Sequence, residues 1–234
     1  MLIEHFDGNV VTADSTQALA ERLAKDVANW LQEGVEQRGS ATLIVSGGST
    51  PAPFFTALSQ INITWNAVTV TLADERWVAV DDELSNEKLV RETLLVNAAA
   101  TAQFLSIYND AGSAEEGWQQ CDDALRAMPN PYDVVVLGMG GDGHTASLFP
   151  DTEGLADACN PATEKLCWPM RPAHIAEARM SLTLAALLDS RQLILHITGE
   201  DKVRVFERAV AGENLPIASV TEAAKTRLQL YWAA

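Results

Sequence analysis

A glycine-rich segment near the middle of the chain carries the side chains best suited to acid–base chemistry. Gly138 to His144 reads Gly-Met-Gly-Gly-Asp-Gly-His and follows the apolar run Val134 to Leu137. A neutral imidazole, with a reference pKa of about 6.5, can take a proton from water and return it to a leaving oxygen. Glycines let the backbone approach a substrate and leave N–H groups free for an oxyanion. We therefore predict that His144 is catalytic, that Asp142 orients or polarises it, and that Gly141 contacts the substrate; a solvated or capping histidine is the alternative.

The same glycines formally satisfy Gly-x-Gly-x-x-Gly, the fingerprint of dinucleotide-binding folds. That fingerprint requires a helix that continues from the third glycine and an acidic residue about 20 positions later, at the end of a second strand. Here Pro150 interrupts the segment about two helical turns after Gly143. We therefore interpret the segment as a substrate loop and reject a dinucleotide cofactor.

A second candidate loop, Ser46-Gly47-Gly48-Ser49-Thr50-Pro51, joins an apolar strand to a helix. Paired glycines allow a tight turn that exposes backbone N–H groups, hydroxyl side chains add donors, and the helix dipole favours negative charge. We predict a phosphate cradle formed by Gly47, Gly48, Ser49 and Thr50. An ordinary strand-to-helix turn is the alternative. The lysine of a Walker sequence is missing, which disfavours nucleoside triphosphates.

Four charged residues are candidates for gripping an anionic substrate. Asp74-Glu75-Arg76-Trp77 follows a predicted strand, where charged side chains are costly to bury unless they serve a site or pair with each other. We predict that Asp74 and Arg76 bind the substrate, Arg76 through a phosphate or sugar oxygen. An Asp74–Arg76 ion pair on a solvated loop is the alternative. Arg179 and Lys202 are predicted to hold the phosphate, although each has the alternative of an ordinary surface cation.

The elements around these loops alternate between strands rich in β-branched residues and stretches of helical period. Such alternation favours crossover units, and hence an α/β fold with a largely parallel, Rossmann-like sheet flanked by helices. We expect a single domain over residues 1–234, without internal repeats or a linker. Strands are predicted at 41–45, 68–72, 104–107, 132–137, 166–170 and 192–197, and helices from 51 and at 85–95, 113–127 and 201–211.

The first helix has the clearest boundaries. Asp14 and Gln17 have the spacing of a capping box, and Gly39 is predicted to close the C-terminal end. Between them runs an apolar stripe of Leu19, Leu23, Val27, Trp30 and Leu31.

Four polar loops fall where ligands usually bind. In open parallel sheets, ligands bind beyond the carboxyl ends of the strands, where helix N-termini and free N–H groups gather. Each of these loops begins directly after a predicted strand, and together they are residues 46–51, 73–78, 138–144 and 198–202. We therefore expect them to share one face.

Charge and hydropathy weigh against two classes of partner. The chain has 32 Asp and Glu against 16 Lys and Arg, a net charge of −16, whereas binding to nucleic acid phosphates needs a basic surface. No apolar run reaches the roughly 18–20 residues of a membrane span. Met1 to His5 also lacks the basic region of a signal peptide. We predict a cytoplasmic protein that contacts neither nucleic acid nor membrane.

Other reactive residues carry little signal. The sequence has no His-Glu-x-x-His and no Cys-x-x-Cys, so we predict no metal site, and no Gly-x-Ser-x-Gly, so no serine nucleophile is evident. The cysteines are interpreted as buried or half-buried free thiols, and the remaining histidines as solvated or capping; these are Cys121, Cys159 and Cys167, and His5, His174 and His196.

Taken together, the motifs resemble those of the 6-phosphogluconolactonases. The resemblance rests on Ser46 to Pro51, Asp74 to Val78, Ser85-Asn86, the block Gly138-x-Gly140-x-Asp142-Gly143-His144-x-x-Ser147-Leu148-Phe149-Pro150, Arg179 to Thr183 and Gly199-x-x-Lys202. It implies the sugar-phosphate isomerase and deaminase type of fold, and hydrolysis of 6-phosphogluconolactone to 6-phosphogluconate in the oxidative pentose phosphate pathway. It also implies no metal or organic cofactor and a small sugar-phosphate lactone as partner; the oligomeric state stays open, with a monomer favoured.

Two alternatives remain beside the lactonase. The related glucosamine-6-phosphate deaminases share the phosphate turn and the Asp-Gly-His core but continue with Phe-Asn-Glu-Pro, whose Glu assists ring opening. This chain has Ser147-Leu148-Phe149-Pro150 there, with no acid at the matching position. A sugar-phosphate sensor that binds without catalysis is the second alternative, because every phosphate contact would persist without chemistry.

Overall fold

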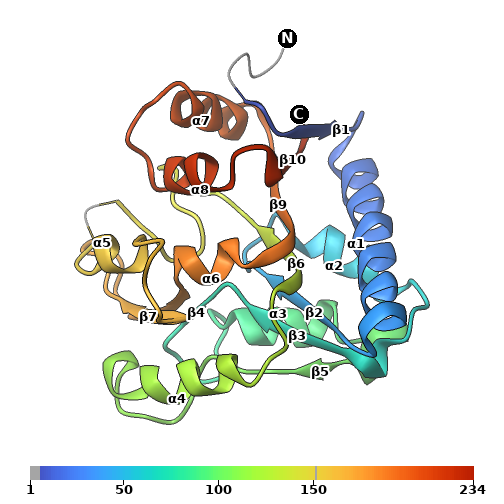
Figure 1. Ribbon diagram of the computed structural model, residues 1–234, viewed down its shortest axis with the longest axis horizontal. Coiled ribbons are helices and arrows are strands. Elements are labelled where there is room, and N and C mark those ends of the chain that lie inside the picture. The colour runs from blue at the N-terminus through green and yellow to red at the C-terminus, as the bar shows by residue number, and fades with distance from the viewer. Residues whose placement is uncertain (1–5, 151) are drawn as a thin grey trace.

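A seven-stranded parallel sheet forms the centre of the molecule (Figure 1). The computed structural model describes residues 6–150 and 152–234. The strand order is β1-β10-β9-β6-β2-β3-β5, and each neighbouring pair is parallel. The strands are β1 (Asn9–Thr12), β2 (Ala41–Val45), β3 (Val68–Leu72), β5 (Gln103–Phe104), β6 (Tyr132–Leu137), β9 (Ser190–Thr198) and β10 (Leu228–Ala233). This is the fold class predicted from the sequence.

Three strands in the middle of the sheet have the predicted boundaries. β2, β3 and β6 begin and end at the predicted residues, and every residue of β2 and β6 is buried. Parallel strands covered on both faces have such continuous apolar runs. β9 extends the predicted 192–197 at both ends, and β5 is shorter than the predicted 104–107. β1 and β10 were not predicted: β1 is a short strand at the edge of the sheet, and β10, which lies between β1 and β9, mixes buried with half-buried residues.

Helices cover both faces of the sheet (Figure 1). α1 packs on β2, β6 and β10 with α2 beside it, whereas α6 and α7 pack on β9 and α8 on β10. The helices are α1 (Thr16–Arg38), α2 (Ala52–Ser59), α3 (Asn86–Thr93), α4 (Ala114–Arg126), α5 (Leu155–Ala158), α6 (Leu184–Leu188), α7 (Glu200–Val210) and α8 (Pro216–Ala224), with short 3-10 turns at Trp65–Ala67, Asn97–Thr101 and Lys225–Arg227.

The start of α1 differs from the prediction by one residue. The N-cap is Ser15, whose hydroxyl accepts a hydrogen bond from the backbone N–H of Ala18 at 3.2 Å. The predicted capping box of Asp14 and Gln17 is therefore wrong: serine and aspartate cap equally well, and the serine lies in the capping position. Gly39 closes the helix as predicted, with φ at 82°.

A second, antiparallel sheet lies beside the first. It has the order β4-β8-β7 and consists of β4 (Asp74–Arg76), β8 (Arg179–Leu182) and β7 (Cys167–Met170). The prediction of a loop at 73–78 is therefore wrong for residues 74–76, because a strand of three residues has no pattern of its own and is defined by its distant partner. The strand predicted at 166–170 exists, but it belongs to this small sheet. The pairing places Arg76 directly opposite Arg179.

The remaining predictions have mixed outcomes. Cys121 and Cys167 are buried and Cys159 is half-buried, each as a free thiol, as predicted. His174 is exposed. His196 is buried on β9, and neither ring nitrogen has a hydrogen-bond partner among the described residues, so its interpretation as solvated or capping is wrong. His5 lies outside the described residues.

Two features are absent from the described residues. No helix in that part of the chain is long and apolar enough to cross a membrane. Nor does any group of three or more His, Cys, Asp or Glu side chains there have an arrangement that would hold a metal ion.

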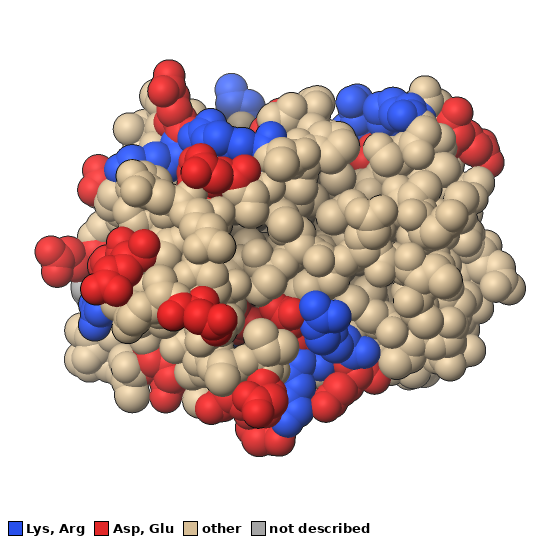
Figure 2. Space-filling model, turned by 90° about the horizontal axis from the view of Figure 1, so that it is seen from below, with Lys and Arg blue, Asp and Glu red and all other residues tan. Residues whose placement is uncertain are grey.

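Charged side chains are unevenly distributed over the molecule. Segments 39–73 and 93–109 contain no Asp, Glu, Lys or Arg. Figure 2 accordingly shows a broad uncharged area on one face, with charged side chains toward its rim. The excess of acidic residues is therefore local, and parts of the surface are free of it.

Candidate active site

A cavity of about 230 Å³ lies at the carboxyl ends of the central strands. The chain leaves β2 toward β3 and β5 on one side and returns to β6 on the other, so the strand order reverses between β2 and β6. Open α/β sheets bind ligands at such a switch point. All four predicted loops contribute to the lining, which consists of Ser46, Gly47, Gly48, Ser49, Thr50, Pro51, Asp74, Arg76, Asn86, Gly138, Met139, Gly140, His144, Ala146, Arg179 and Lys202.

The loop between β2 and α2 has the properties of an anion cradle. Within the described part of the chain, the backbone N–H groups of residues 47–50 donate no hydrogen bond. Gly48 has φ at 99°, a conformation that a side chain would strain. The loop leads into the N-terminus of α2, and it lies in the uncharged segment 39–73, so no neighbouring carboxylate along the chain repels an anion.

Two glycines let the loop after β6 fold back on itself. The N–H of Gly140 donates to the carbonyl of His144 at 2.8 Å, and the N–H of Gly143 donates to the carbonyl of Gly140 at 3.2 Å. A Cβ on Gly140 would lie 2.1 Å from Nδ1 of His144, and Gly143 has φ at 80°. A side chain on Gly140 would displace the imidazole, and one on Gly143 would be strained and would meet Leu215, so both glycines are required by this geometry.

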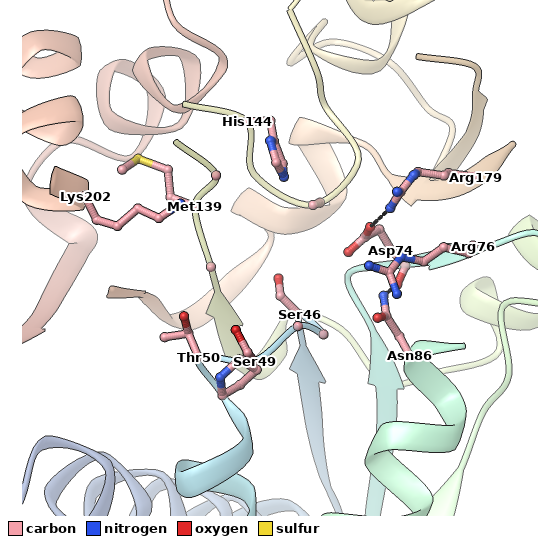
Figure 3. A pocket seen from close by; sticks show the side chains of 16 residues that line it. Ser46, Ser49, Thr50, Asp74, Arg76, Asn86, Met139, His144, Arg179 and Lys202 are labelled. Atoms are coloured by element: carbon pink, nitrogen blue, oxygen red, sulfur yellow. Dashed lines mark hydrogen bonds and ion pairs between the residues drawn. The ribbon is translucent and has the colours of Figure 1, made fainter. Parts of the chain in front are cut away.

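His144 is held by a carboxylate and faces the cavity. Its Nδ1 lies 2.5 Å from Oδ1 of Asp142, which also accepts the backbone N–H of His144 at 3.1 Å. Burial raises the pKa of Asp142, but the two contacts with His144 outweigh it, and the pKa is lowered overall. An ionised carboxylate only accepts hydrogen bonds, so Nδ1 carries a proton, and in the neutral imidazole the lone pair is then on Nε2. The ring points into the cavity (Figure 3).

Phe149 packs against both the imidazole and a cation. Its ring centroid lies 4.0 Å from that of His144, at an interplanar angle of 30°, and Cζ of Arg179 lies 5.2 Å from the same centroid. Phe149 is buried. The ring therefore supports one face of the imidazole and also contacts the guanidinium.

Two arginines on neighbouring strands form a cationic wall. Arg76 and Arg179 are cross-strand partners in β4 and β8, an arrangement that is destabilising for like charges unless an anion lies between or beside them. The Nε atoms of both are buried without a hydrogen-bond partner among the described residues. Burial, and then repulsion by Arg76, lower the pKa of Arg179, which Asp74 opposes. This wall is preorganised for an anionic ligand.

Asp74 stabilises this wall by pairing with one of its two arginines. Its Oδ2 accepts the hydroxyl of the buried Ser147 at 2.6 Å and lies 3.8 Å from Nη1 of Arg179. Arg76 instead donates from Nη1 to the carbonyl of Leu84. The alternative of an Asp74–Arg76 ion pair on a solvated loop is therefore wrong: Asp74 is buried, and its ion pair is with Arg179.

Lys202 supplies a third cation, on the opposite side of the cavity (Figure 3). It lies near the start of α7, and burial lowers its pKa, against the attraction of Asp142. Its ammonium makes no ion pair with the described residues under a 4.0 Å limit. Cations therefore approach the cavity from two sides.

Most of the predicted site residues meet in this cavity. Every predicted substrate-binding residue except Gly141 lines it, as does His144. Asp142 contacts His144 from behind, and a Cβ on Gly141 would lie 3.9 Å from Nζ of Lys202. Sequence reasoning did not assign Asn86 or Met139 to the site. The pair Ser85-Asn86 was visible as a motif, but nothing in its residue types indicated a role.

Glu75 is a further residue whose role the sequence did not indicate. It is buried, and its carboxylate accepts the backbone N–H groups of Arg76, Asn86 and Glu87 at 2.7–2.8 Å. Burial raises its pKa, against these hydrogen bonds. The carboxylate caps the N-terminus of α3 and fixes that helix to β4, so it positions residues of the cavity wall.

Comparison with known proteins identifies the family. The family model described as Glucosamine-6-phosphate isomerases/6-phosphogluconolactonase matches residues 14–232. The chain belongs to this family. A relative from Mesorhizobium japonicum named 6-phosphogluconolactonase is 47% identical over 216 residues, which cover 92% of this chain and 91% of the relative. Another of that name, from Rhizobium meliloti, is 41% identical over 228 residues, 96% of this chain and 98% of the relative.

Solved structures of the glucosamine-6-phosphate isomerase/6-phosphogluconolactonase family have the same fold. A 6-phosphogluconolactonase from Shewanella baltica has a TM-score of 0.94 and 42% identity, covering 100% of both chains. A monomeric glucosamine-6-phosphate deaminase has a TM-score of 0.78 at 15% identity, over 96% of this chain and 97% of that one, a likeness of fold alone. The family description thus names two activities, and the residues of the site must decide between them.

Proposed function

We propose that the chain hydrolyses 6-phospho-D-glucono-1,5-lactone to 6-phospho-D-gluconate, the second step of the oxidative pentose phosphate pathway. The observation that carries this proposal is a carboxylate-held imidazole facing a cavity with cations on its other walls. The imidazole is suited to activating water, and the cations to holding a phosphate remote from the reacting carbonyl. Relatives named 6-phosphogluconolactonase, up to 47% identical, support the same reaction.

The reaction begins with attack of water on the lactone carbonyl. Nε2 of His144 takes a proton from the water as its oxygen bonds to C1, and the imidazolium that forms is stabilised by Asp142. Negative charge develops on the carbonyl oxygen. Its stabilisation is assigned to backbone N–H groups of the glycine loop after β6 other than those of Gly140 and Gly143, which bond within the loop, an effect of about 3 kcal/mol per donor.

Collapse of the tetrahedral intermediate opens the ring. The bond between C1 and the ring oxygen breaks, and His144 returns its proton to that oxygen, which leaves as the C5 hydroxyl. The carboxylic acid formed at C1 ionises in water. The chain supplies the base, the acid and the oxyanion donors, so the reaction needs no covalent bond between the protein and the substrate.

Phosphate binding is assigned to the cradle and the cations. Ser49, Thr50, Arg179 and Lys202 hold the 6-phosphate, and Arg76 contacts the phosphate or a sugar oxygen. The free N–H groups of residues 47–50 and the unpartnered Nε atoms of the arginines support this assignment. In a chain of net charge −16, such a cluster is what allows an anionic substrate to bind.

The deaminase alternative is not favoured by the side chain at position 149. Ring opening of an amino sugar by this family's deaminases relies on a glutamate at the matching position, and here Phe149 packs against His144. An apolar ring neither donates nor accepts the proton that this step requires. The site therefore lacks an acid that the alternative chemistry uses.

We also propose that the protein acts in the cytoplasm on a small-molecule substrate. A twofold excess of acidic over basic residues disfavours the phosphate backbone of nucleic acids. The lactone is a small, charged metabolite, which the 230 Å³ cavity suits in scale.

A comparison of three compounds tests the proposed function. Initial rates are measured on 6-phosphogluconolactone and on gluconolactone, each corrected for spontaneous hydrolysis, and ammonia release is measured with glucosamine 6-phosphate. We expect a kcat/KM at least 100-fold higher for the phosphorylated lactone and no ammonia. Binding of the phosphorylated lactone without accelerated hydrolysis would indicate a sensor, and ammonia release would indicate a deaminase.

A further inference from the structure

Asn86, the first residue of α3, presents a buried oxygen to the cavity wall. It is 3% exposed and lines the cavity beside Asp74 and Arg76 (Figure 3). Its Nδ2 donates to the backbone carbonyl of Asp74 at 2.9 Å. Its Oδ1 is buried and has no hydrogen-bond partner among the described residues. A buried acceptor left in that state costs about 1–3 kcal/mol, so it calls for a physical explanation.

The orientation of the amide is fixed by its partners. A backbone carbonyl only accepts hydrogen bonds, so the NH₂ group of Asn86 must face Asp74 and the oxygen must face the other way. The backbone N–H of Asn86 donates to Oε1 of Glu75 at 2.8 Å, which holds the residue in place. Rotating the amide would bring two acceptors together, so the oxygen keeps its direction.

A glycine of the cradle packs directly against this oxygen. A Cβ on Gly47 would lie 1.9 Å from Oδ1 of Asn86, far inside van der Waals contact. Gly47 and Asn86 both line the cavity. Any other residue there would displace the amide, so the structure brings the backbone of the cradle close to the Asn86 oxygen.

The chemistry of the wall selects the kind of group that Asn86 can bind. Phosphate oxygens accept hydrogen bonds, and they match the guanidinium groups of Arg76 and Arg179 but not an amide oxygen. A hydroxyl group donates, and sugar-derived lactones carry several. Among the described residues no protein donor bonds the Asn86 oxygen, and Nη1 of the neighbouring Arg76 is bonded to the carbonyl of Leu84.

From these observations we infer that Oδ1 of Asn86 accepts a hydrogen bond from a ring hydroxyl of the substrate and makes the site selective for the hydroxylated lactone. This inference rests on the proposed function. It adds a residue that recognises a hydroxyl group of the sugar ring, whereas the arginines bind the phosphate. A site that buries an acceptor for a hydroxyl rejects an analogue lacking that hydroxyl, because the acceptor then stays unpaired.

The experiment compares 6-phosphogluconolactone with the analogues that lack the hydroxyl at C2, C3 or C4, in the wild type and in Asn86→Ala. We expect the wild type to disfavour one of the analogues about 10- to 100-fold in kcat/KM. In Asn86→Ala the parent lactone should lose about that factor while the same analogue loses little, so the preference falls to within about threefold of unity.

Two further variants separate recognition from structure. Asn86→Asp keeps an oxygen acceptor and should retain the preference for the hydroxylated lactone, even as overall activity falls. Ser85→Ala removes the side-chain cap of the same helix, in which the hydroxyl accepts the N–H of Lys88 at 3.1 Å, and a hydrogen bond from that hydroxyl to Glu75 at 3.1 Å. It leaves in place the Asn86 amide and its hydrogen bond to Asp74. It should lower the melting temperature without changing the preference.

The outcomes are distinguishable. A wild type that leaves 6-phosphogluconolactone at its spontaneous rate would overturn both the proposed function and this inference. An active wild type whose preference is unchanged in Asn86→Ala, or equally lost in Ser85→Ala, would overturn the inference alone.

Discussion

Changing Asp142 tests how the imidazole is held. Both the ring Nδ1 and the backbone N–H of His144 meet one oxygen of Asp142, at 2.5 and 3.1 Å. An oxygen at that point therefore orients the ring and keeps the proton on Nδ1. Asp142→Asn retains an oxygen there and removes the charge, whereas Asp142→Ala removes the acceptor itself. The two variants should accordingly differ.

The expected losses follow from the exposure of the pair. A hydrogen bond to a charged group contributes about 1.5–3 kcal/mol and a neutral one about 0.5–1.5 kcal/mol. The Asp142 side chain is 49% exposed, so solvent screens its charge. We therefore assign about 1.4 kcal/mol to the charge and about 2.7 kcal/mol to the whole contact, or about 10-fold and 100-fold losses of kcat.

Steady-state kinetics on 6-phosphogluconolactone measure these losses. KM should stay within about twofold, because Asp142 does not line the cavity. Asp14→Asn, a matched change at an exposed acid outside the cavity, should behave as the wild type. Combined with His144→Ala, Asp142→Ala should add nothing further. Equal losses in Asp142→Asn and Asp142→Ala, or additive losses in the double variant, would refute the reasoning.

Three further predictions concern the phosphate grip, the stacked ring and the buried histidine. Arg179→Met should raise KM for the phosphorylated lactone about 10- to 100-fold and leave kinetics on gluconolactone unchanged; an equal effect on both lactones would count against a phosphate role. Phe149→Leu keeps an apolar side chain but loses the stack on His144, so kcat should fall about 10-fold, with rescue by Phe149→Tyr as the check. Burial lowers the pKa of His196 to about 4. An unfolded imidazole titrates near 6.5, so the unfolded chain binds more protons between these values, and the stabilisation present above about pH 6.5 is lost as the pH falls toward 4. Urea titrations should therefore show that this group lowers the free energy of unfolding by about 3 kcal/mol between pH 6.5 and pH 4. In His196→Leu this part of the pH dependence should disappear. An unchanged pH dependence in that variant would contradict the explanation.

The central sheet was predictable because its signal is local. Residues 41–45, 68–72 and 132–137 are rich in apolar and β-branched residues and are bounded by turn residues, and the strands begin and end at the same positions. The loops that follow β2 and β6 could be predicted as parts of the site for a similar reason. Each combines glycines with polar side chains directly after a strand, which is typical of loops that bind ligands.

The small sheet was beyond local reasoning. β4 has three residues, and its partner β8 lies about a hundred positions along the chain, so only the folded structure pairs Arg76 with Arg179. For the same reason the alternative of an ion pair for Asp74 named Arg76, whereas its partner in the structure is Arg179. The unpartnered oxygen of Asn86 is likewise a property of the folded wall, because the sequence does not show which donors reach it.

The central claim is that His144 activates water, and His144→Ala tests it most directly. The described structure offers His174, exposed and outside the cavity, for a matched control variant His174→Ala. The account predicts that kcat on 6-phosphogluconolactone falls by a factor of about 10² to 10⁴ in His144→Ala, with the affinity for 6-phosphogluconate kept within about threefold and His174→Ala unchanged. A kcat for His144→Ala equal to that of the wild type would contradict it.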